Sequence, residues 1–258
     1  MLEAIFLGIV QGLTEFLPIS SSAHIRILGE FLPSAEDPGA TFTAIMQIGT
    51  ELAVLIYFFQ QIKQLFKGGK LAVLIIVGSI PIFILGFIGQ DYIRSNFRSL
   101  WLIAATLIIF GVLLGFLDYV GKKEKVLDQL TTRDGLLYGF AQSLALIPGV
   151  SRSGSTIAMG RLLGYRREEA LRYSFLLAIP AVLGSGAYEL LNSFSEPTNT
   201  FSASETFVAT FTAFVVGYAV ISWLMKFVQT RSFMPFVLYR VALGTFLLIL
   251  LATGTISA

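Results

Sequence analysis

The stretch Pro148-Gly149-Val150-Ser151-Arg152-Ser153-Gly154-Ser155-Thr156 is rich in hydroxyl groups and glycine, and it lies between two strongly apolar segments. Proline and glycine end a preceding helix, and serine is a favourable N-cap for a following one. Such a break leaves backbone N–H groups free at the start of the second helix, where they favour an anion. The stretch therefore predicts two helices that meet at a polar break with a candidate anion site.

A weaker copy of this pattern stands near the N-terminus. Residues 8–24 read GIVQGLTEFLPISSSAH, and residues 139–148 read GFAQSLALIP before the serine-rich run. Both contain glycine, glutamine three residues later, an apolar turn, a proline and then serines. The apolar arms are too short or too interrupted to cross a bilayer, which favours re-entrant helix–break–helix hairpins. The alternative is two ordinary spans that are kinked at proline.

The composition indicates an all-α integral membrane protein with a single membrane domain over residues 1–258. Of the 258 residues, 55% are hydrophobic and 13% are charged, and the mean hydropathy is +0.78. Soluble domains carry about 25% charged residues. The absence of cysteine excludes disulfides, iron–sulfur clusters and thiolate metal sites. Leu2 to Leu17 has no basic leader and contains Gln11 and Glu15, so we expect it to belong to the mature protein.

Apolar stretches of roughly 20 residues can cross a bilayer. They predict six spans, at about 41–60, 71–90, 100–120, 169–191, 205–226 and 233–254. Three spans separate the hairpins, so the second hairpin should enter from the opposite face. This is an inverted-topology repeat, with halves of about 1–120 and 134–258 joined by a cytoplasmic loop at 121–133. In such repeats the interrupted segments share a site near the midplane.

The distribution of basic residues predicts the orientation, because lysine and arginine in short loops mark the cytoplasmic side. One face of the six-span arrangement carries Lys63, Lys67, Lys70, Lys122, Lys123, Lys125, Arg133, Arg161, Arg166, Arg167, Arg172, Lys226 and Arg231. The other face carries only Arg26, Arg94 and Arg98. We therefore expect both termini and the opening of the site to be extracytoplasmic.

Glu15 is the most informative acidic residue, because an unpaired carboxylate at membrane depth is costly and is usually functional. Gln11 lies one helical turn earlier on the same face. Together they offer oxygen ligands of the kind that Mg²⁺ or Ca²⁺ accepts. The alternative is that Glu15 only forms a hydrogen bond to the break that follows Pro18.

His24 is the only histidine, and helical spacing would place it over Ser20 and Ser21. Serine, histidine and glutamate within one hairpin can act as nucleophile, base and orienting group. A packed or capping histidine is the alternative interpretation.

Arg152 offers a planar set of donors that matches a phosphate group. Thr156, one turn later, adds a hydroxyl, and the N–H groups of Ser153 and Gly154 complete a predicted phosphate cradle. The alternative role for Arg152 is an ion pair with Glu15 that ties the hairpins together, and the two roles are compatible. For Glu51, Glu189 and Arg240, the other charges in or near spans, structural pairing is expected.

At these residues the sequence resembles the undecaprenyl-diphosphate phosphatase family, the bacitracin-resistance membrane phosphatases of bacteria. The Glu/Gln-x-x-x-Glu pattern of the family is present as Gln11 to Glu15, and it runs into Pro18, Ser20, Ser21 and His24. The Pro-Gly-x-Ser-Arg-Ser-x-x-Thr pattern is present as Pro148 to Thr156. Position 11 is glutamine where many members have glutamate, which leaves less negative charge for a metal.

The resemblance implies hydrolysis of undecaprenyl diphosphate to the monophosphate and phosphate, which recycles the carrier lipid for peptidoglycan and other envelope polymers. It implies a location in the bacterial plasma membrane and dependence on a divalent cation. It also implies catalytic roles for Glu15, Ser21 and His24 with Ser20 nearby, and diphosphate binding by the second motif, through Ser151, Arg152, Ser153 and Thr156.

The predicted partners are a polyprenyl diphosphate lipid and the bilayer lipids, not nucleic acid, and a homodimer is left open. We expect Ser21 to attack the terminal phosphorus while His24 and Glu15 manage its proton. Direct attack by water with Glu15 as base is the alternative. From architecture alone, a transporter or flippase for an anion or a polyprenyl phosphate lipid is an equal rival. A membrane scaffold without a site is a third interpretation, which buried Glu15 and Arg152 disfavour.

Overall fold

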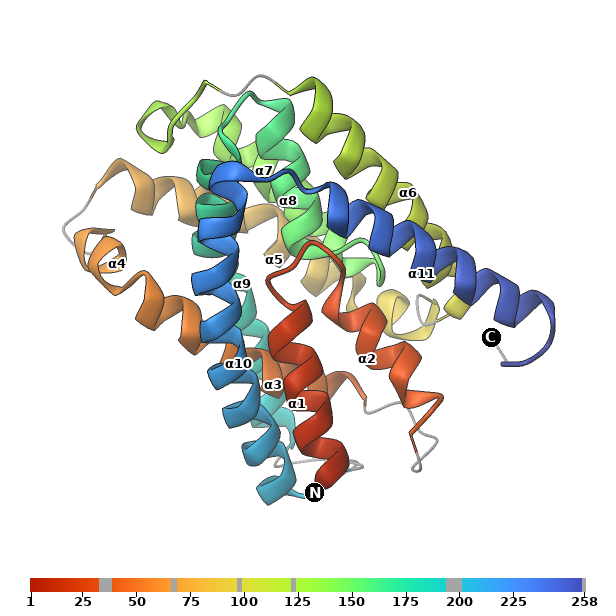
Figure 1. Cartoon of the computed structure of the whole chain (residues 1–258). Coiled ribbons are helices and arrows are strands. Elements are labelled where there is room, and N and C mark those ends of the chain that lie inside the picture. Colours follow the sequence, from red (N-terminus) through yellow and green to blue (C-terminus); the bar gives the residue numbers. More distant parts are fainter. Residues whose placement is uncertain (33–38, 66–68, 97–98, 122–123, 194–200, 257–258) are drawn as a thin grey trace.

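The computed structural model describes residues 1–32, 39–65, 69–96, 99–121, 124–193 and 201–256 (Figure 1). Within these ranges the regular structure is helical, apart from one isolated bridge between Lys125 and Tyr165. The α-helices are α1 (Leu2–Thr14), α2 (Ser21–Gly29), α3 (Ala40–Tyr57), α4 (Phe59–Leu65), α5 (Lys70–Asn96), α6 (Leu100–Val120), α7 (Thr132–Ser143), α8 (Arg152–Leu162), α9 (Arg167–Ser193), α10 (Ala203–Thr230) and α11 (Met234–Ala252). Two 3₁₀ turns, η1 (Leu127–Gln129) and η2 (Leu144–Leu146), precede and follow α7.

In the described residues, 5 helices are long and apolar enough to cross a membrane: α5, α6, α9, α10 and α11. They coincide with the last five predicted spans. The first predicted span, 41–60, differs, because α3 ends at Tyr57 and Phe58 leaves the helical conformation before α4 begins. With 18 residues, α3 is about 27 Å long, slightly less than the ~30 Å hydrocarbon core of a bilayer.

Both predicted hairpins are helix–break–helix units. The first break, residues 15–20, separates α1 from α2, and the second break, residues 147–151, separates η2 from α8. This confirms the interrupted helices and excludes a continuous helix through either segment. In Figure 1 the α1–α2 pair lies in the lower part of the bundle and the α7–α8 pair in the upper part, with the two breaks between them.

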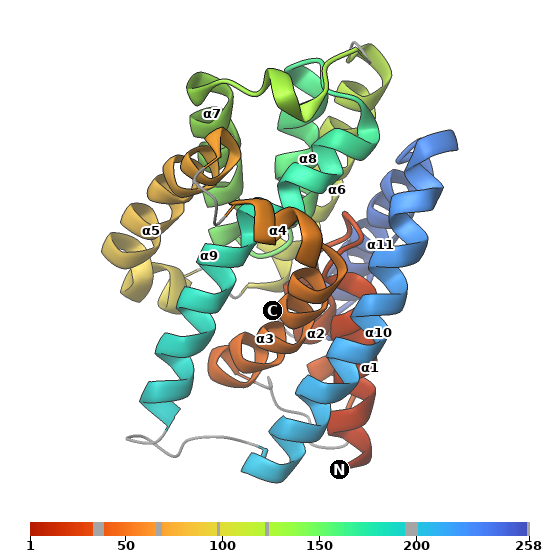
Figure 2. The same ribbon diagram turned by 90° about the vertical axis from the view of Figure 1, so that its left-hand side faces the viewer.

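Each hairpin packs against a helix from the other half of the chain. α1 packs against α10, and α7 packs against α5 (Figure 2). The glycine of each motif permits this approach: a Cβ added to Gly8 would lie 2.5 Å from the Ala209 carbonyl oxygen, and one added to Gly139 would lie 2.2 Å from the Gly78 carbonyl oxygen. α3 also packs against α9, and α6 packs against α11.

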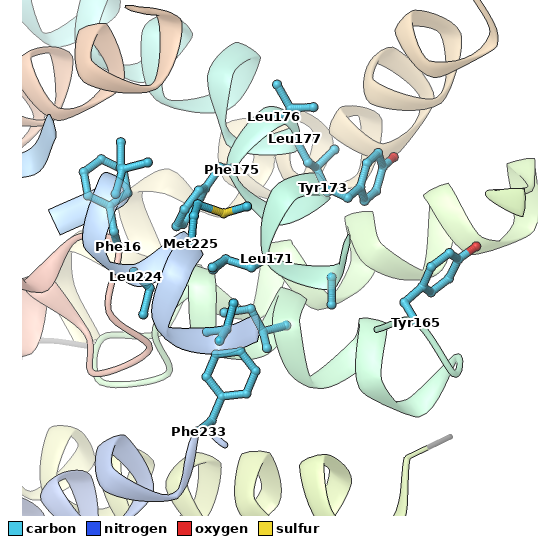
Figure 3. Close-up of a cluster of buried hydrophobic side chains, with 14 of the residues drawn as sticks. Phe16, Tyr165, Leu171, Tyr173, Phe175, Leu176, Leu177, Leu224, Met225 and Phe233 are labelled. Carbon is cyan, nitrogen blue, oxygen red and sulfur yellow. The ribbon is translucent and has the colours of Figure 1, made fainter. Parts of the chain in front are cut away.

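An apolar cluster fixes the first break against the second half of the chain (Figure 3). Phe16, in the break, is fully buried and meets the Phe175 ring of α9 edge-on, with 5.2 Å between ring centroids. Leu171 of α9 and Leu224 and Met225 of α10 complete the neighbourhood. In a bilayer, where the lipid tails are as apolar as these side chains, close packing of this kind and interhelical hydrogen bonds hold helices together. The break is therefore held by packing as well as by polar contacts.

A buried ion cluster joins four helices away from the breaks. Asp118 of α6 accepts hydrogen bonds from Arg161 Nε of α8 at 2.9 Å, from Arg167 Nε of α9 at 2.7 Å and from the Phe233 N–H before α11 at 3.2 Å. Arg161 was counted among the loop cations that predict orientation, but it is fully buried. Four of the other counted cations lie outside the described residues: Lys67, Arg98, Lys122 and Lys123.

Candidate functional site

The two breaks touch each other, as the sequence predicts. Ser153 Oγ donates a hydrogen bond to the Leu17 carbonyl at 3.1 Å. Arg152 donates to Glu15 at 2.7 Å, which closes an ion pair between the hairpins. The charges and hydroxyls of both motifs therefore share one buried neighbourhood.

The N-caps of α2 and α8 have the same unusual backbone conformation. Ser20 has φ 75° and ψ 95°, and Ser151 has φ 70° and ψ 116°. Within the described ranges they are the non-glycine residues with positive φ, a conformation that costs of order 1–3 kcal/mol and is often found at functional sites. Each strained serine turns the chain so that the next residue, Ser21 or Arg152, begins a helix beside Glu15.

Glu15 is buried at the centre of the site and accepts hydrogen bonds from three side chains. Gln11 Nε2 and Ser21 Oγ both donate to Oε2, at 2.7 and 2.6 Å, and Arg152 donates to Oε1. The carboxylate is thus within direct reach of a hydroxyl proton, the arrangement of a base next to a nucleophile. Ser21 is bonded to Glu15 itself, without an intervening histidine.

His24 has other partners than the sequence indicates. Its Nδ1 lies 2.7 Å from the Ser20 carbonyl oxygen, and its Nε2 lies 2.7 Å from the Tyr239 hydroxyl. A carbonyl only accepts, so Nδ1 donates, and in the neutral ring Nε2 accepts the hydrogen bond of Tyr239. In this structure His24 therefore holds the strained carbonyl of the N-cap rather than the hydroxyl of Ser21.

The predicted phosphate-binding residues divide into two groups. Ser151 and Arg152 face the cavity described below, and Ser151 Oγ caps α8 by accepting the Gly154 N–H at 3.1 Å. Thr156 turns away from the cavity: its hydroxyl bonds the Arg152 carbonyl at 2.7 Å and lies 2.5 Å from Ser174 Oγ of α9. Ser153 lies between the breaks.

A cavity of about 510 Å³ opens beside this cluster. Its polar end is lined by both breaks and the start of α2, through Glu15, Ser20, Ser21, Ser22, Ser151 and Arg152. Its walls come mainly from α5 and α9 and include Ile82, Phe83, Ala181 and Val182, which directly follow Pro81 and Pro180. Gln47, Tyr188 and Glu189 also line it. The cavity therefore offers a charged end and an apolar flank, as an amphipathic ligand requires.

The oxygen ligands at the site suit a cation that binds together with a phosphate group better than a cation that is held by protein ligands alone. Gln11 Oε1 is buried without a hydrogen-bond partner among the described residues and is a possible oxygen ligand, but Gln11 lies behind Glu15 and does not line the cavity. Both oxygens of Glu15 are already engaged. In the described residues no three His, Cys, Asp or Glu side chains cluster as metal ligands do. Mg²⁺ commonly takes one or two protein ligands and completes its shell with water and substrate phosphate.

Arg240 of α11 anchors both breaks from behind. Its guanidinium donates to the carbonyls of Pro18 at 3.1 Å, Gly149 at 2.8 Å and Val150 at 3.1 Å. It also reaches the α6 carbonyls of Thr106 at 3.3 Å and Leu107 at 3.2 Å. The charge pairing expected for Arg240 differs in the structure: its hydrogen-bond partners in the described part of the chain are backbone carbonyls.

Two neighbours of the site were not predicted as site residues. Glu51 lies 3.7 Å from Arg152 and was expected only to form a structural pair, although its burial in an apolar helix is the same signal that singled out Glu15. Tyr239 gave no signal, because 215 residues separate it from His24.

The described chain is an all-helical bundle with membrane-length helices, and a buried carboxylate, hydroxyl and guanidinium meet at the junction of its two broken helices. These features define a polytopic membrane protein with a buried polar centre. Within that class the sequence matches one family, described as bacitracin resistance protein BacA, over residues 4–246. The chain belongs to this family, which confirms the resemblance inferred from the two motifs.

Curated relatives match over nearly their whole length. The chain is 58% identical over 274 residues to a Micrococcus luteus protein named undecaprenyl-diphosphatase, covering 100% of this chain and 99% of the relative. It is 56% identical over 272 residues to undecaprenyl-diphosphatase 2 of Agrobacterium fabrum, covering 100% and 98%. It is 55% identical over 273 residues to the undecaprenyl-diphosphatase of Pseudarthrobacter chlorophenolicus, covering 99% of each chain.

Proposed function

We infer that this chain is an undecaprenyl-diphosphatase, which hydrolyses undecaprenyl diphosphate to undecaprenyl phosphate and inorganic phosphate. The names of its relatives support the substrate. One observation carries the chemistry: the Ser21 hydroxyl and the Arg152 guanidinium bond the same buried carboxylate, Glu15, at 2.6 and 2.7 Å. A nucleophile, a base and a phosphate-binding cation thus meet at the polar end of a cavity with apolar walls. The product would return the carrier lipid to envelope polymer synthesis.

In the proposed reaction, Ser21 Oγ attacks the terminal phosphorus, and Glu15 Oε2 accepts the serine proton. The bond from that phosphorus to the bridging oxygen breaks, and undecaprenyl phosphate leaves with the proton. Water then attacks the phosphoserine, and Glu15 carries a proton from the water to Ser21 as phosphate departs. Arg152 stabilises the charge on the transferring group.

The remaining predicted residues support this centre. Ser151 caps the helix that presents Arg152, and Ser20 turns Ser21 toward Glu15. His24 keeps the Ser20 carbonyl in place, and we propose that it acts on catalysis through that contact. Thr156 keeps the first turn of α8 against α9. Gln11 and Glu15 would hold a divalent cation together with the diphosphate, and such a cation would neutralise phosphate charge.

We further propose that the chain is an inverted repeat in a bacterial plasma membrane, with α3 as the sixth span and the site open to the extracytoplasmic face. The exchanged contacts support the repeat, because α1 packs on α10 as α7 packs on α5. The matching conformations of Ser20 and Ser151 support it as well. Interrupted helices that share a site are also typical of transporters, so transport of an anion or a polyprenyl phosphate lipid is the second candidate function.

The deciding experiment measures inorganic phosphate released from undecaprenyl diphosphate by the purified protein in detergent, where transport produces no signal. We expect the wild type to release phosphate, and we expect Arg152→Ala to lose at least ~100-fold, about 2.7 kcal/mol of barrier. EDTA should suppress the activity, and Mg²⁺ or Ca²⁺ should restore it. A wild type that remains inactive with either cation would refute the phosphatase and leave transport as the function to test.

Ser21→Ala separates serine attack from direct attack by water. We expect at least a ~100-fold loss of phosphate release, because the hydroxyl bonded to Glu15 is the proposed nucleophile. Rapid quenching of the wild type with lipid labelled at the terminal phosphate should trap label at Ser21. Ser22→Ala, which removes another hydroxyl that lines the cavity, should trap label as the wild type does. Full activity of Ser21→Ala would rule out attack by Ser21.

A further inference from the structure

Glu51 is a buried acidic residue next to the site, and the proposed reaction leaves it unused. It lies on α3 and is fully buried. Its Oε2 is 3.7 Å from Arg152, and neither carboxylate oxygen has a hydrogen-bond partner in the described part of the chain. A buried carboxylate without hydrogen bonds is costly. Glu51 therefore requires an explanation that packing alone does not give.

The position of Glu51 relative to Arg152 suggests its role. Glu15 lines the cavity, whereas Glu51 does not. One nitrogen of Arg152 contacts both carboxylates, at 2.7 and 3.7 Å, and its other terminal nitrogen is buried without a partner. The guanidinium is thus shared between a carboxylate at the cavity and a carboxylate behind it. A cation shared in this way is held less exclusively by either anion.

We propose that Glu51 is a positioning residue for Arg152, an inference that rests on the proposed function. When a diphosphate enters, Arg152 exchanges Glu15 for phosphate oxygens, and Glu51 keeps a counter-charge beside the guanidinium during this exchange. Glu15 is then free to accept the serine proton. Without Glu51, Arg152 pairs with Glu15 alone. This ion pair then keeps Glu15 from accepting the serine proton.

A conservative substitution at position 51 supplies a specific test. Glu51→Asp keeps a carboxylate behind Arg152, on a side chain that is one methylene shorter. Glu51→Gln keeps the length of the side chain but removes its negative charge. If the charge is what positions Arg152, Glu51→Asp should therefore retain more of the wild-type function than Glu51→Gln.

The experiment measures kcat and KM for phosphate release by wild type, Glu51→Gln and Glu51→Asp, together with thermal unfolding of each. We expect Glu51→Gln to lose about tenfold in kcat with an unchanged unfolding midpoint. Glu51→Asp should lose less kcat than Glu51→Gln, because it keeps a negative charge behind Arg152. Thr50→Val is the matched control: it removes a buried hydroxyl from the same helix that bonds only the Gln47 carbonyl, and it should behave as wild type.

Wild-type kcat in Glu51→Gln would overturn the inference, and so would an equal loss of kcat in Glu51→Asp. If Glu51→Gln does not fold, wild-type kcat in Glu51→Asp, which moves the carboxylate away from Arg152, would overturn it, and a reduced kcat would support it. An inactive wild type would refute the proposed function instead, so the two failures are distinguishable.

Discussion

Glu15→Gln is expected to reduce phosphate release by at least ~100-fold, about 2.7 kcal/mol of barrier. The amide has nearly the same shape and can still accept from Ser21, but it is a very weak base. The substitution also removes the carboxylate that pairs with Arg152 at 2.7 Å. Both losses fall on the chemical step, so kcat should drop more than KM rises. Phosphate release as a function of lipid concentration measures the two constants.

Glu30→Gln is the matched control for this prediction. Glu30 lies at the end of the same hairpin, pairs with Arg26 and does not line the cavity. It should retain wild-type activity, because a partly exposed pair of this kind contributes little. Activity of Glu15→Gln within threefold of the wild type would remove Glu15 from the role of base. The structure would then require another acceptor for the Ser21 proton.

The helices were largely predictable, because apolar length and the proline, glycine and serine signals are local properties of the sequence. The interrupted hairpins follow from those signals. The ion pair of Arg152 with Glu15 is the alternative role that these two rare charges suggested for Arg152. The end of α3 did not, because Phe58 carries neither a proline nor a glycine signal. An apolar stretch long enough to span a membrane continues through Phe58, and only the three-dimensional structure shows where the helix stops.

The direction of side chains within the site was less predictable. Spacing places His24 and Thr156 one turn from catalytic neighbours, but it does not fix the rotation of a short helix about its axis. The unusual conformations of Ser20 and Ser151 set that rotation. They turn Thr156 toward Ser174 and His24 toward Tyr239, a contact between opposite ends of the chain. Strain of this kind is stabilised by tertiary contacts that no local pattern encodes.

Those tertiary contacts converge on Arg240, and Arg240→Ala is expected to lower the free energy of unfolding by more than ~3 kcal/mol. The side chain is fully buried and donates to five carbonyls, from Pro18, Thr106, Leu107, Gly149 and Val150. The α6 carbonyls of Thr106 and Leu107 keep their helical N–H partners, but truncation removes the Arg240 donor from the carbonyls of Pro18, Gly149 and Val150, at about 1–3 kcal/mol for each one that water cannot reach. Thermal unfolding in detergent measures the loss. Arg231→Ala, at an exposed arginine that follows α10, should leave the midpoint unchanged.

Arg240→Lys separates stability from positioning. An ammonium has three donors and no planar fork, so it should retain part of the stability but hold only one of the two breaks well. Gly154 shows how closely the guanidinium fits, since a Cβ at that position would lie 2.9 Å from Arg240 Nη1. At a temperature where Arg240→Lys is folded, its kcat should still fall by about tenfold, because Ser21 and Arg152 follow the two breaks. Wild-type kcat in the folded lysine variant would mean that the breaks keep their geometry without the anchor, and that their strained serines are held by packing around Phe16.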